Sequence, residues 1–272
     1  MNTLEKIIAT KKIKVEESKK LYPVKLLERS IYFNSTPVSL NKYLLRKDKS
    51  GIIAEIKKRS PSKGIINNYV NVEKTSIGYM QAGASAISVL TDKTFFGGCN
   101  QDLLTARKFN FCPILRKDFI IDEYQIIEAK SIGADAILLI AACLTKNEIE
   151  IFSDLASSLG MEVLLEIHDE TEIEKISEKT NIIGVNNRDL KTLKIDLQTS
   201  FNLIESLPKE KTKVAESGIE TVDSILKLKE AGYSGFLIGS YFMKHPEPSL
   251  ACKEFITVIQ SEILKRSVSH AS

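Results

Sequence analysis

The sequence predicts an α/β fold in which eight strand-and-helix units close into a (β/α)8 barrel behind an N-terminal helical extension. Three observations support this fold: short runs rich in Val, Ile and Leu recur along the chain, stretches with helical spacing separate them, and polar side chains gather where the runs end. With 272 residues, of which 43% are hydrophobic, the chain can bury one large core. We therefore expect a single domain.

Eight runs have the length and the apolar composition of buried parallel strands. They are Ile52–Lys57, Ala86–Leu90, Pro113–Lys117, Ala136–Ile140, Glu162–Ile167, Ile182–Asn186, Lys213–Ser217 and Gly235–Ile238.

The segments between these runs have the 3.6-residue spacing of amphipathic helices. Clear examples are Asp122–Ile132, Lys146–Leu159, Glu170–Ile176, Ser200–Leu207 and Val222–Ala231. Four helix-to-strand junctions carry a glycine suited to the position after a helix end, namely Gly83, Gly133, Gly160 and Gly232.

Strict alternation of strand and helix implies parallel strands joined by right-handed crossovers, and eight such units close into a barrel. An open doubly wound sheet is the alternative. Such a sheet usually carries a GxGxxG loop after its first strand, and the segment from Lys57 to Gly64 lacks that pattern. The pattern therefore favours the barrel.

Residues 1–48 precede the first strand and contain helical patterns at Leu4–Lys19 and Pro23–Ser30. This segment is too long for a tail and too short for a separate domain. We expect a helical cap packed against a barrel that spans residues 49–272.

Composition narrows the possible functions. The net charge is +3 and the basic residues are interleaved with acidic ones, which argues against nucleic acid and anionic membranes as partners but allows a small anionic substrate. The N-terminal segment lacks the apolar core of a signal peptide, and no apolar run approaches ~18 residues, so we expect a cytoplasmic protein without membrane spans. Cys99, Cys112, Cys143 and Cys252 form no CxxC pair and are expected to be buried free thiols.

Ionisable and polar residues stand at the carboxyl ends of five predicted strands, the end where barrel enzymes build their active sites. They are Glu55, Lys57, Lys117, Glu166, Asn186 and Glu216. Internal ion pairs that merely close the barrel mouth are the competing interpretation. Convergence of charge from five strands favours an active site.

Two glycine-serine steps follow the last two strands, Ser217-Gly218 and Gly239-Ser240. An ordinary turn would explain either step alone. In barrel enzymes, however, the loops after strands seven and eight often bind phosphate through backbone N–H groups, so the pair predicts a phosphate site.

Five segments in order resemble the indole-3-glycerol phosphate synthase family over nearly the whole chain. They begin with Ile53–Gly64, which contains Glu55-Ile56-Lys57 and Ser60-Pro61-Ser62, and continue with Leu90–Gly98, Pro113–Ile120 with its Lys117-Asp118-Phe119, Gly184–Leu190 and Val214–Ile219. Related phosphate-binding barrels share the glycine-serine elements, but the Glu-x-Lys and Lys-Asp-Phe segments are specific to this family.

The resemblance implies a small phosphorylated substrate, 1-(2-carboxyphenylamino)-1-deoxyribulose 5-phosphate, which is converted to indole-3-glycerol phosphate with release of carbon dioxide and water. It implies neither a metal nor an organic cofactor, and either a monomer or a homodimer. It makes Lys117 the acid that polarises the ketone and Lys57 the group that holds the carboxylate.

By the same resemblance, Glu166 and Glu55 are candidate bases, and Asn186 and Glu216 orient the sugar hydroxyls and the lysines. The sequence does not assign the later acid and base roles individually to Lys57, Glu55 and Glu166. The residues expected to hold phosphate or to line the anthranilate ring are Ser60, Phe96, Phe119, Ser217, Gly218, Gly239 and Ser240.

Three further residues lie near the predicted site. His168 is expected on the opposite strand face from Glu166 or in the loop, without a catalytic role, and with only His245 and His270 elsewhere no metal cluster is expected. Arg188 is expected to pair with a loop carboxylate, and Lys63 to close over the substrate or to be solvated. The competing functions are a phosphoribosyl isomerase barrel and a non-catalytic barrel that only binds a phosphorylated metabolite.

Overall fold

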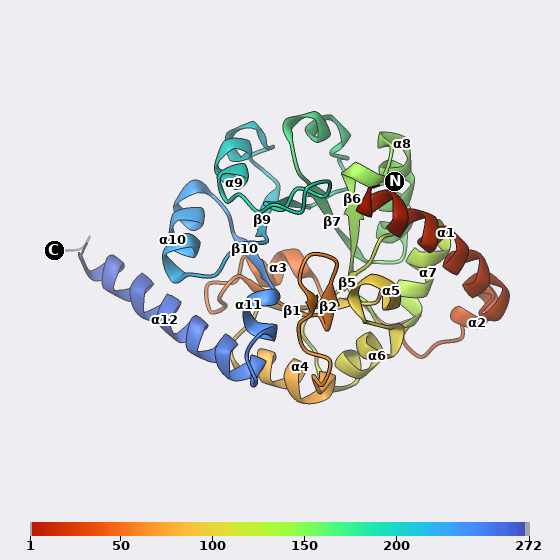
Figure 1. Ribbon diagram of the computed structural model, residues 1–272, viewed down its shortest axis with the longest axis horizontal. Helices are drawn as coiled ribbons and strands as arrows, with labels where there is room; N and C mark the ends of the chain where they lie inside the picture. The colour runs from red at the N-terminus through yellow and green to blue at the C-terminus, as the bar shows by residue number, and fades with distance from the viewer. Residues whose placement is uncertain (1, 270–272) are drawn as a thin grey trace.

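The computed structural model describes residues 2–269 and confirms the predicted barrel (Figure 1). Within those residues, eight parallel strands are hydrogen-bonded in the closed order β1-β10-β9-β8-β7-β6-β5-β4. They are β1 (Ile52–Ile56), β4 (Ala86–Leu90), β5 (Ile114–Lys117), β6 (Ala136–Ile140), β7 (Glu162–Ile167), β8 (Ile182–Asn186), β9 (Thr212–Glu216) and β10 (Gly235–Ile238). Each strand lies within one residue of the predicted run.

Helices form a ring around the strands (Figure 1). They are α4 (Val72–Gln81), α5 (Lys93–Phe96), α6 (Asn100–Phe109), α7 (Glu123–Ser131), α8 (Lys146–Ser158), α9 (Gln198–Leu203), α10 (Val222–Ala231), α11 (Ser240–Met243) and α12 (Pro248–Ser269), with 3₁₀ turns η1 (Ala141–Cys143), η2 (Glu170–Lys175) and η3 (Ile204–Ser206). The four predicted junction glycines all have positive φ, as a left-handed residue after a helix requires.

Two predicted helices of the barrel differ from the structure. The segment Glu170–Ile176 is not an α-helix, since η2 is a 3₁₀ helix that ends at Lys175. Its six residues offer few hydrogen bonds to repay α-helix nucleation. The segment Ser200–Leu207 is divided between α9 and η3.

Side chains alternate between two apolar clusters, and this alternation places the charged residues. In β1, Ile52, Ala54 and Ile56 pack outward against the helices, whereas Ile53 packs with the residues that fill the barrel. Glu55 has the parity of Ile53 and therefore points inward, near the carboxyl end of the strand. A polar layer thus lies directly above an apolar core.

The N-terminal extension covers both ends of the barrel. Helix α3 (Leu40–Leu44) closes the end opposite the strand carboxyl ends, where Leu40 is buried among the interior residues. At that end the Glu162 carboxylate accepts hydrogen bonds from Ser39 Oγ at 2.5 Å and from the Asn41 backbone N–H at 2.7 Å. The predicted Pro23–Ser30 helix is shorter, as α2 (Val24–Leu27).

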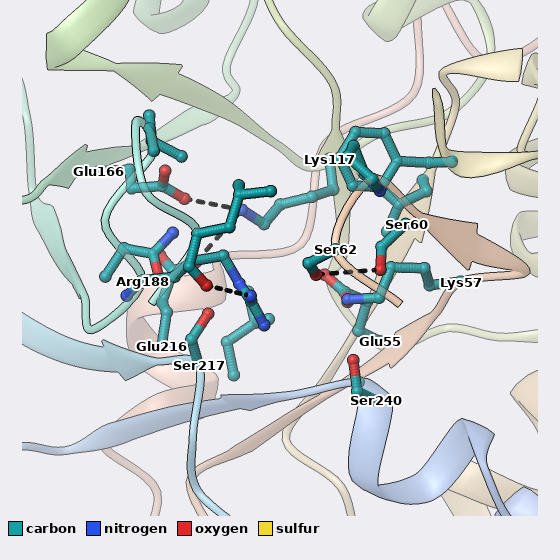
Figure 2. Close-up of a pocket in the computed structure, with 18 of the residues that line it drawn as sticks. Glu55, Lys57, Ser60, Ser62, Lys117, Glu166, Arg188, Glu216, Ser217 and Ser240 are labelled. Carbon is teal, nitrogen blue, oxygen red and sulfur yellow. Dashed lines mark hydrogen bonds and ion pairs between the residues drawn. The ribbon is translucent and has the colours of Figure 1, made fainter. Parts of the chain in front are cut away.

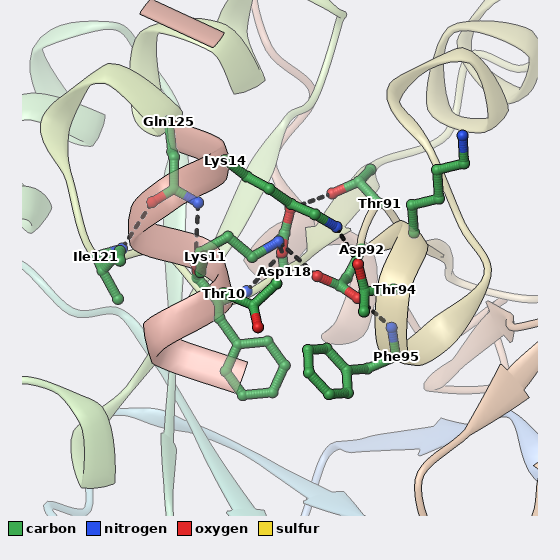
Figure 3. A network of polar contacts seen from close by, with 12 residues as sticks. Thr10, Lys11, Lys14, Thr91, Asp92, Thr94, Phe95, Asp118, Ile121 and Gln125 are labelled. Carbon is green, nitrogen blue, oxygen red and sulfur yellow. Dashed lines mark hydrogen bonds and ion pairs between the residues drawn. The ribbon is translucent and has the colours of Figure 1, made fainter. Parts of the chain in front are cut away.

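Helix α1 (Thr3–Leu21) is attached to the barrel by a buried ion-pair network (Figure 3). Lys11 Nζ lies 2.6 Å from Asp118 Oδ1 and 2.8 Å from Asp92 Oδ2, with the lysine only 5% exposed. Burial alone would lower the pKa of Lys11, but Asp118 and Asp92 raise it above its ordinary value. Asp118 also accepts a hydrogen bond from Thr91 at 2.7 Å and pairs with Arg116. Helix α1 is therefore held to the barrel by the positively charged form of Lys11.

The cysteines are free: Cys112 and Cys252 are buried, and Cys99 and Cys143 are partly buried. Burial raises the pKa of the Cys112, Cys143 and Cys252 thiols to about 12, so these thiols stay protonated. In the part of the chain that the structure describes, no helix is both long enough and apolar enough to cross a membrane.

The Lys11 network predicts a large stability effect. Lys11→Met should lower the free energy of unfolding by about 3–5 kcal/mol, because it removes the ammonium that compensates two buried carboxylates. Lys12→Met is the matched control, since Lys12 is an exposed neighbour on the same helix and should change stability by no more than about 0.5 kcal/mol. Urea unfolding measures both variants. Equal stabilities would show that the network contributes nothing.

Candidate active site

The carboxyl ends of the strands open into a pocket, and every residue predicted for the site lines it (Figure 2). Those side chains come from β1, β5, β7, β8 and β9 and from the loops that follow strands. They form two charged groups on opposite sides of the pocket. Figure 2 shows Lys117, Glu166 and Glu216 extending toward one side, and Lys57, Glu55 and Ser60 on the other.

Lys117 is the centre of the first charged group. Its Nζ lies 2.8 Å from Glu166 Oε2 and 3.2 Å from Glu216 Oε2. Burial by itself would lower the pKa of Lys117, but the carboxylates of Glu166, Glu216 and Glu55 raise it well above its ordinary value. Lys117 is therefore an ammonium at neutral pH, and it is held between two carboxyl groups from neighbouring regions of the barrel.

The two carboxyl groups around Lys117 do not behave alike. Burial would raise the pKa of Glu166, but Lys117 and His168 hold it well below the ordinary value. For Glu216, burial and the nearby Glu166 charge outweigh Lys117 and raise the pKa to about 8. Glu166 therefore has the lower pKa of the two, and a single proton shared by the pair resides on Glu216. This is the pattern expected when adjacent groups divide acid and base roles.

Close packing fixes the position of Glu216. On the neighbouring strand β8, a Cβ at Gly184 would lie 2.3 Å from Glu216 Oε1. Gly239 gives the same clearance to Glu55, where a Cβ would approach the carboxylate to 2.2 Å. Each glycine thus provides the space for one buried carboxyl group.

Lys57 and Glu55 make the second charged group, with a direct ion pair between them. Glu55 is buried at 2% exposure, and Lys57 lies at the edge of the pocket. In the loop beyond, β2 (Arg59–Ser60) and β3 (Gly64–Ile65) form a small hairpin that the sequence analysis did not predict. Its turn is tightened by the Ser60 hydroxyl, which accepts a hydrogen bond from the Lys63 backbone N–H at 3.2 Å.

The loop after β9 has an unusual backbone. Ser217 has φ of 67° and Gly218 has φ of 76°, both in the left-handed region. For serine this conformation is uncommon and needs support from its surroundings. Asn187 supplies it, because its side-chain amide donates to the carbonyls of Glu216 at 3.0 Å and Ser217 at 3.1 Å. The sequence analysis did not single out Asn187.

Apolar side chains cover the rest of the pocket. Phe96 and Phe119 line it with ring centroids 6.0 Å apart. Helix α1 adds Leu4 and Ile7, which the sequence analysis missed because an amphipathic pattern shows which residues are buried but not against what. The pocket therefore has a charged floor and an apolar wall.

One expectation for the nearby residues was wrong. Arg188 lines the pocket and donates to the Leu193 carbonyl at 2.9 Å, a backbone group rather than the expected loop carboxylate. His168 does lie in the loop after β7, but its Nε2 is only 3.2 Å from Glu166 Oε1. Residues two apart share a strand face, which explains that approach. Lys63 is exposed, 3.9 Å from the Glu220 carboxylate.

Within residues 2–269 no group of His, Cys, Asp or Glu side chains is arranged to hold a metal ion. The barrel, its inward lysines and carboxyl groups and its glycine-serine loops define an acid–base enzyme of the (β/α)8 class.

Comparisons with known proteins place this enzyme more narrowly. A family model described as indole-3-glycerol phosphate synthase matches residues 4–255. Two relatives with that name come from Bacteroides thetaiotaomicron, 46% identical over 94% of this chain and 98% of the relative, and from Caldanaerobacter subterraneus, 43% identical over the same shares. The chain belongs to the indole-3-glycerol phosphate synthase family.

More distant solved structures share the barrel alone. A thiamine phosphate pyrophosphorylase from Pyrococcus furiosus has a TM-score of 0.58 at 16% identity and covers 82% of this chain and 98% of its own. A chain of the tryptophan synthase complex from the same organism also has a TM-score of 0.58, at 14% identity, over 79% of this chain and 99% of its own.

The clearance at Gly184 yields a prediction for Glu216. Gly184→Ala should displace the Glu216 carboxyl group and lower both turnover and the free energy of unfolding, the latter by about 1–3 kcal/mol, as overpacking does. In a Glu216→Ala background the same change should cost almost nothing, because the clashing atom is gone. Urea unfolding of the two single variants and the double variant gives the coupling. Additive costs would mean that Gly184 serves another purpose.

Proposed function

We propose that this chain catalyses the indole-3-glycerol phosphate synthase reaction through the side chains of the pocket described above. In that reaction an aromatic carbon of 1-(2-carboxyphenylamino)-1-deoxyribulose 5-phosphate attacks the ketone carbon, and the carboxyl group leaves as carbon dioxide. Loss of water then gives indole-3-glycerol phosphate. The enzyme is a carboxy-lyase of tryptophan biosynthesis. The observation that carries the proposed site is the Lys117 ammonium, held between Glu166 and Glu216 at the end of the barrel where the glycine-serine loops lie.

Ring closure requires stabilisation of negative charge on the ketone oxygen. Lys117 is the acid in this step, because its ammonium is already charged and already inside the pocket when the substrate arrives. Lys57, on the opposite side of the pocket, holds the substrate carboxylate until it leaves. The two lysines thereby act at different positions on one substrate.

Dehydration requires a proton acceptor for the ring and an acid for the departing hydroxyl. Glu166 and Glu55 are the candidate acceptors, and the contacts of Glu166 with Lys117 and His168 favour its ionised form, which can accept a proton. Lys57 serves as a later acid beside Glu55. Asn186 and Glu216 orient the sugar hydroxyls, and the proton on Glu216 gives it a hydrogen-bond donor for that purpose.

The phosphate is held where Ser217-Gly218 and Gly239-Ser240 meet Ser60. Small residues here let backbone N–H groups approach the phosphate oxygens. Phe96 and Phe119 lie where they can flank the anthranilate ring. We also propose a cytoplasmic location, because a substrate that carries both phosphate and carboxylate does not diffuse across membranes, and an assembly that is a monomer or a homodimer.

The two lysines give the central test of this mechanism. Lys117→Ala should lower turnover by about 10²-fold or more while leaving affinity for a product analogue within a few-fold, since its contribution appears as charge develops. Lys57→Ala should weaken both turnover and affinity. Indole fluorescence follows product formation, and calorimetry gives the affinity. Near-normal turnover of Lys117→Ala would remove it from the acid role.

The phosphate site can be tested without turnover. Inorganic sulfate should occupy the mouth between Ser217-Gly218 and Gly239-Ser240 in a soaked crystal, bound mainly through backbone N–H groups. Inorganic phosphate should compete with the substrate for the same reason. An empty mouth with both loops ordered would contradict this assignment.

A further inference from the structure

His168 stands immediately beside the proposed proton acceptor. It follows β7 by one residue, and its Nε2 lies 3.2 Å from Glu166 Oε1. The other carboxylate oxygen of Glu166, Oε2, lies 2.8 Å from Lys117 Nζ. The two oxygens of Glu166 are therefore each directed at a different basic group.

Glu172 holds the far side of the imidazole. Its Oε2 lies 3.3 Å from His168 Nδ1 and also accepts the His168 backbone N–H at 2.7 Å. Glu172 is itself buried, at 7% exposure, on the 3₁₀ helix η2. The ring thus stands between two carboxylates, hydrogen-bonded through Nδ1 to Glu172 and within ion-pair distance of Glu166 through Nε2, and this arrangement favours an imidazolium.

Two other titratable groups lie near the His168 imidazole. Cys143 on η1 lies within the fields of both Glu166 and Glu172, and its thiol has a pKa raised to about 12 by burial and by those two carboxylates. Lys175 on η2 is nearby, with its ammonium on the carbonyls of Ala141 and Leu144. Burial by itself would lower the pKa of His168, but contacts with Glu166 and Glu172 raise it to about 10. The ring is therefore charged at neutral pH.

His168 is what distinguishes the two carboxyl groups around Lys117. Glu166 and Glu216 are equally buried, at 2% and 1% exposure, and both contact the same ammonium. Only Glu166 also contacts a second cationic group among the described ion pairs. Two adjacent carboxylates resist simultaneous ionisation, so the second cation decides which of them keeps the negative charge.

We propose that His168 is a positioning residue whose imidazolium, clamped by Glu172, keeps Glu166 ionised and turned toward Lys117 and leaves the shared proton on Glu216. This role of His168 rests on the proposed function of Glu166, because His168 affects the substrate only through that residue.

The test replaces the ring by a neutral donor. His168→Gln should lower kcat by about 10–100-fold near neutral pH, the usual range for a group that supports a reacting residue, with KM within a few-fold. Loss of the imidazolium raises the pKa of Glu166, so a smaller fraction is ionised at a given pH. The acid limb of the kcat profile should therefore move to higher pH by about one unit or more, and the deficit should shrink as the pH rises.

Glu172→Gln is the second variant, because it keeps a hydrogen-bonding group beside the His168 backbone and removes one charge from the clamp. It should shift the acid limb in the same direction by a smaller amount. His245→Gln is the matched control, a histidine-to-glutamine change at a residue that packs against Tyr241 outside this network, and it should leave the profile in place. A second readout needs no turnover: ring nitrogen NMR shifts should report an imidazolium at His168 at about pH 8.

The outcomes separate the two proposals. If Glu166→Gln abolishes turnover while His168→Gln leaves the pH profile unmoved, or if the His168 ring is neutral at about pH 8, the positioning role is wrong and the proposed function stands. If Glu166→Gln retains turnover, the assignment of Glu166 falls, and with it the role of His168. A uniform loss of turnover at every pH, accompanied by a lower melting temperature, would make His168 a structural residue.

Discussion

The ammonium of Lys117, enclosed by carboxyl groups inside the barrel mouth, is the interaction on which the site depends. A buried charge is tolerated only where opposite charge and hydrogen bonds compensate it. Here the Glu166 carboxylate supplies the opposite charge, and the Glu216 carboxyl group supplies a second polar contact from another strand. Strand parity makes this possible, since the same alternation that directs Ile53 into the core directs Glu55 into the mouth. The same side chains therefore form the internal ion pairs and supply the acid and base groups.

Apolar side chains of the barrel lie below and around this polar layer. Leu115, Leu164 and Val214 fill the interior below it, and α3 seals the far end. The charged groups open to the mouth of the pocket, where Phe96, Phe119 and α1 narrow the approach. Electrostatic interactions between these side chains are stronger in such surroundings than they would be in water.

The fold and the strand residues that line the pocket could be predicted from the sequence, because strand composition and parity are local properties. Lys117 and Glu216 stand at strand ends that any closed parallel barrel brings together. Contacts that depend on loop conformation could not be predicted. Asn187 supports the strained Ser217, Arg188 reaches a carbonyl, and His168 meets Glu166 because η2 places Glu172 behind the ring. No periodicity encodes the direction in which such side chains point.

The attachment of α1 also bears on the order of events during folding. Lys11 and Asp118 are 107 residues apart in the chain, so their contact closes a long loop and must await β4 and β5, the strands after which Asp92 and Asp118 lie. A helix synthesised early thus docks late, and it brings Leu4 and Ile7 to the pocket when it does. Completion of the wall is thereby coupled to completion of the barrel, and a half-folded chain presents no enclosed site to its substrate.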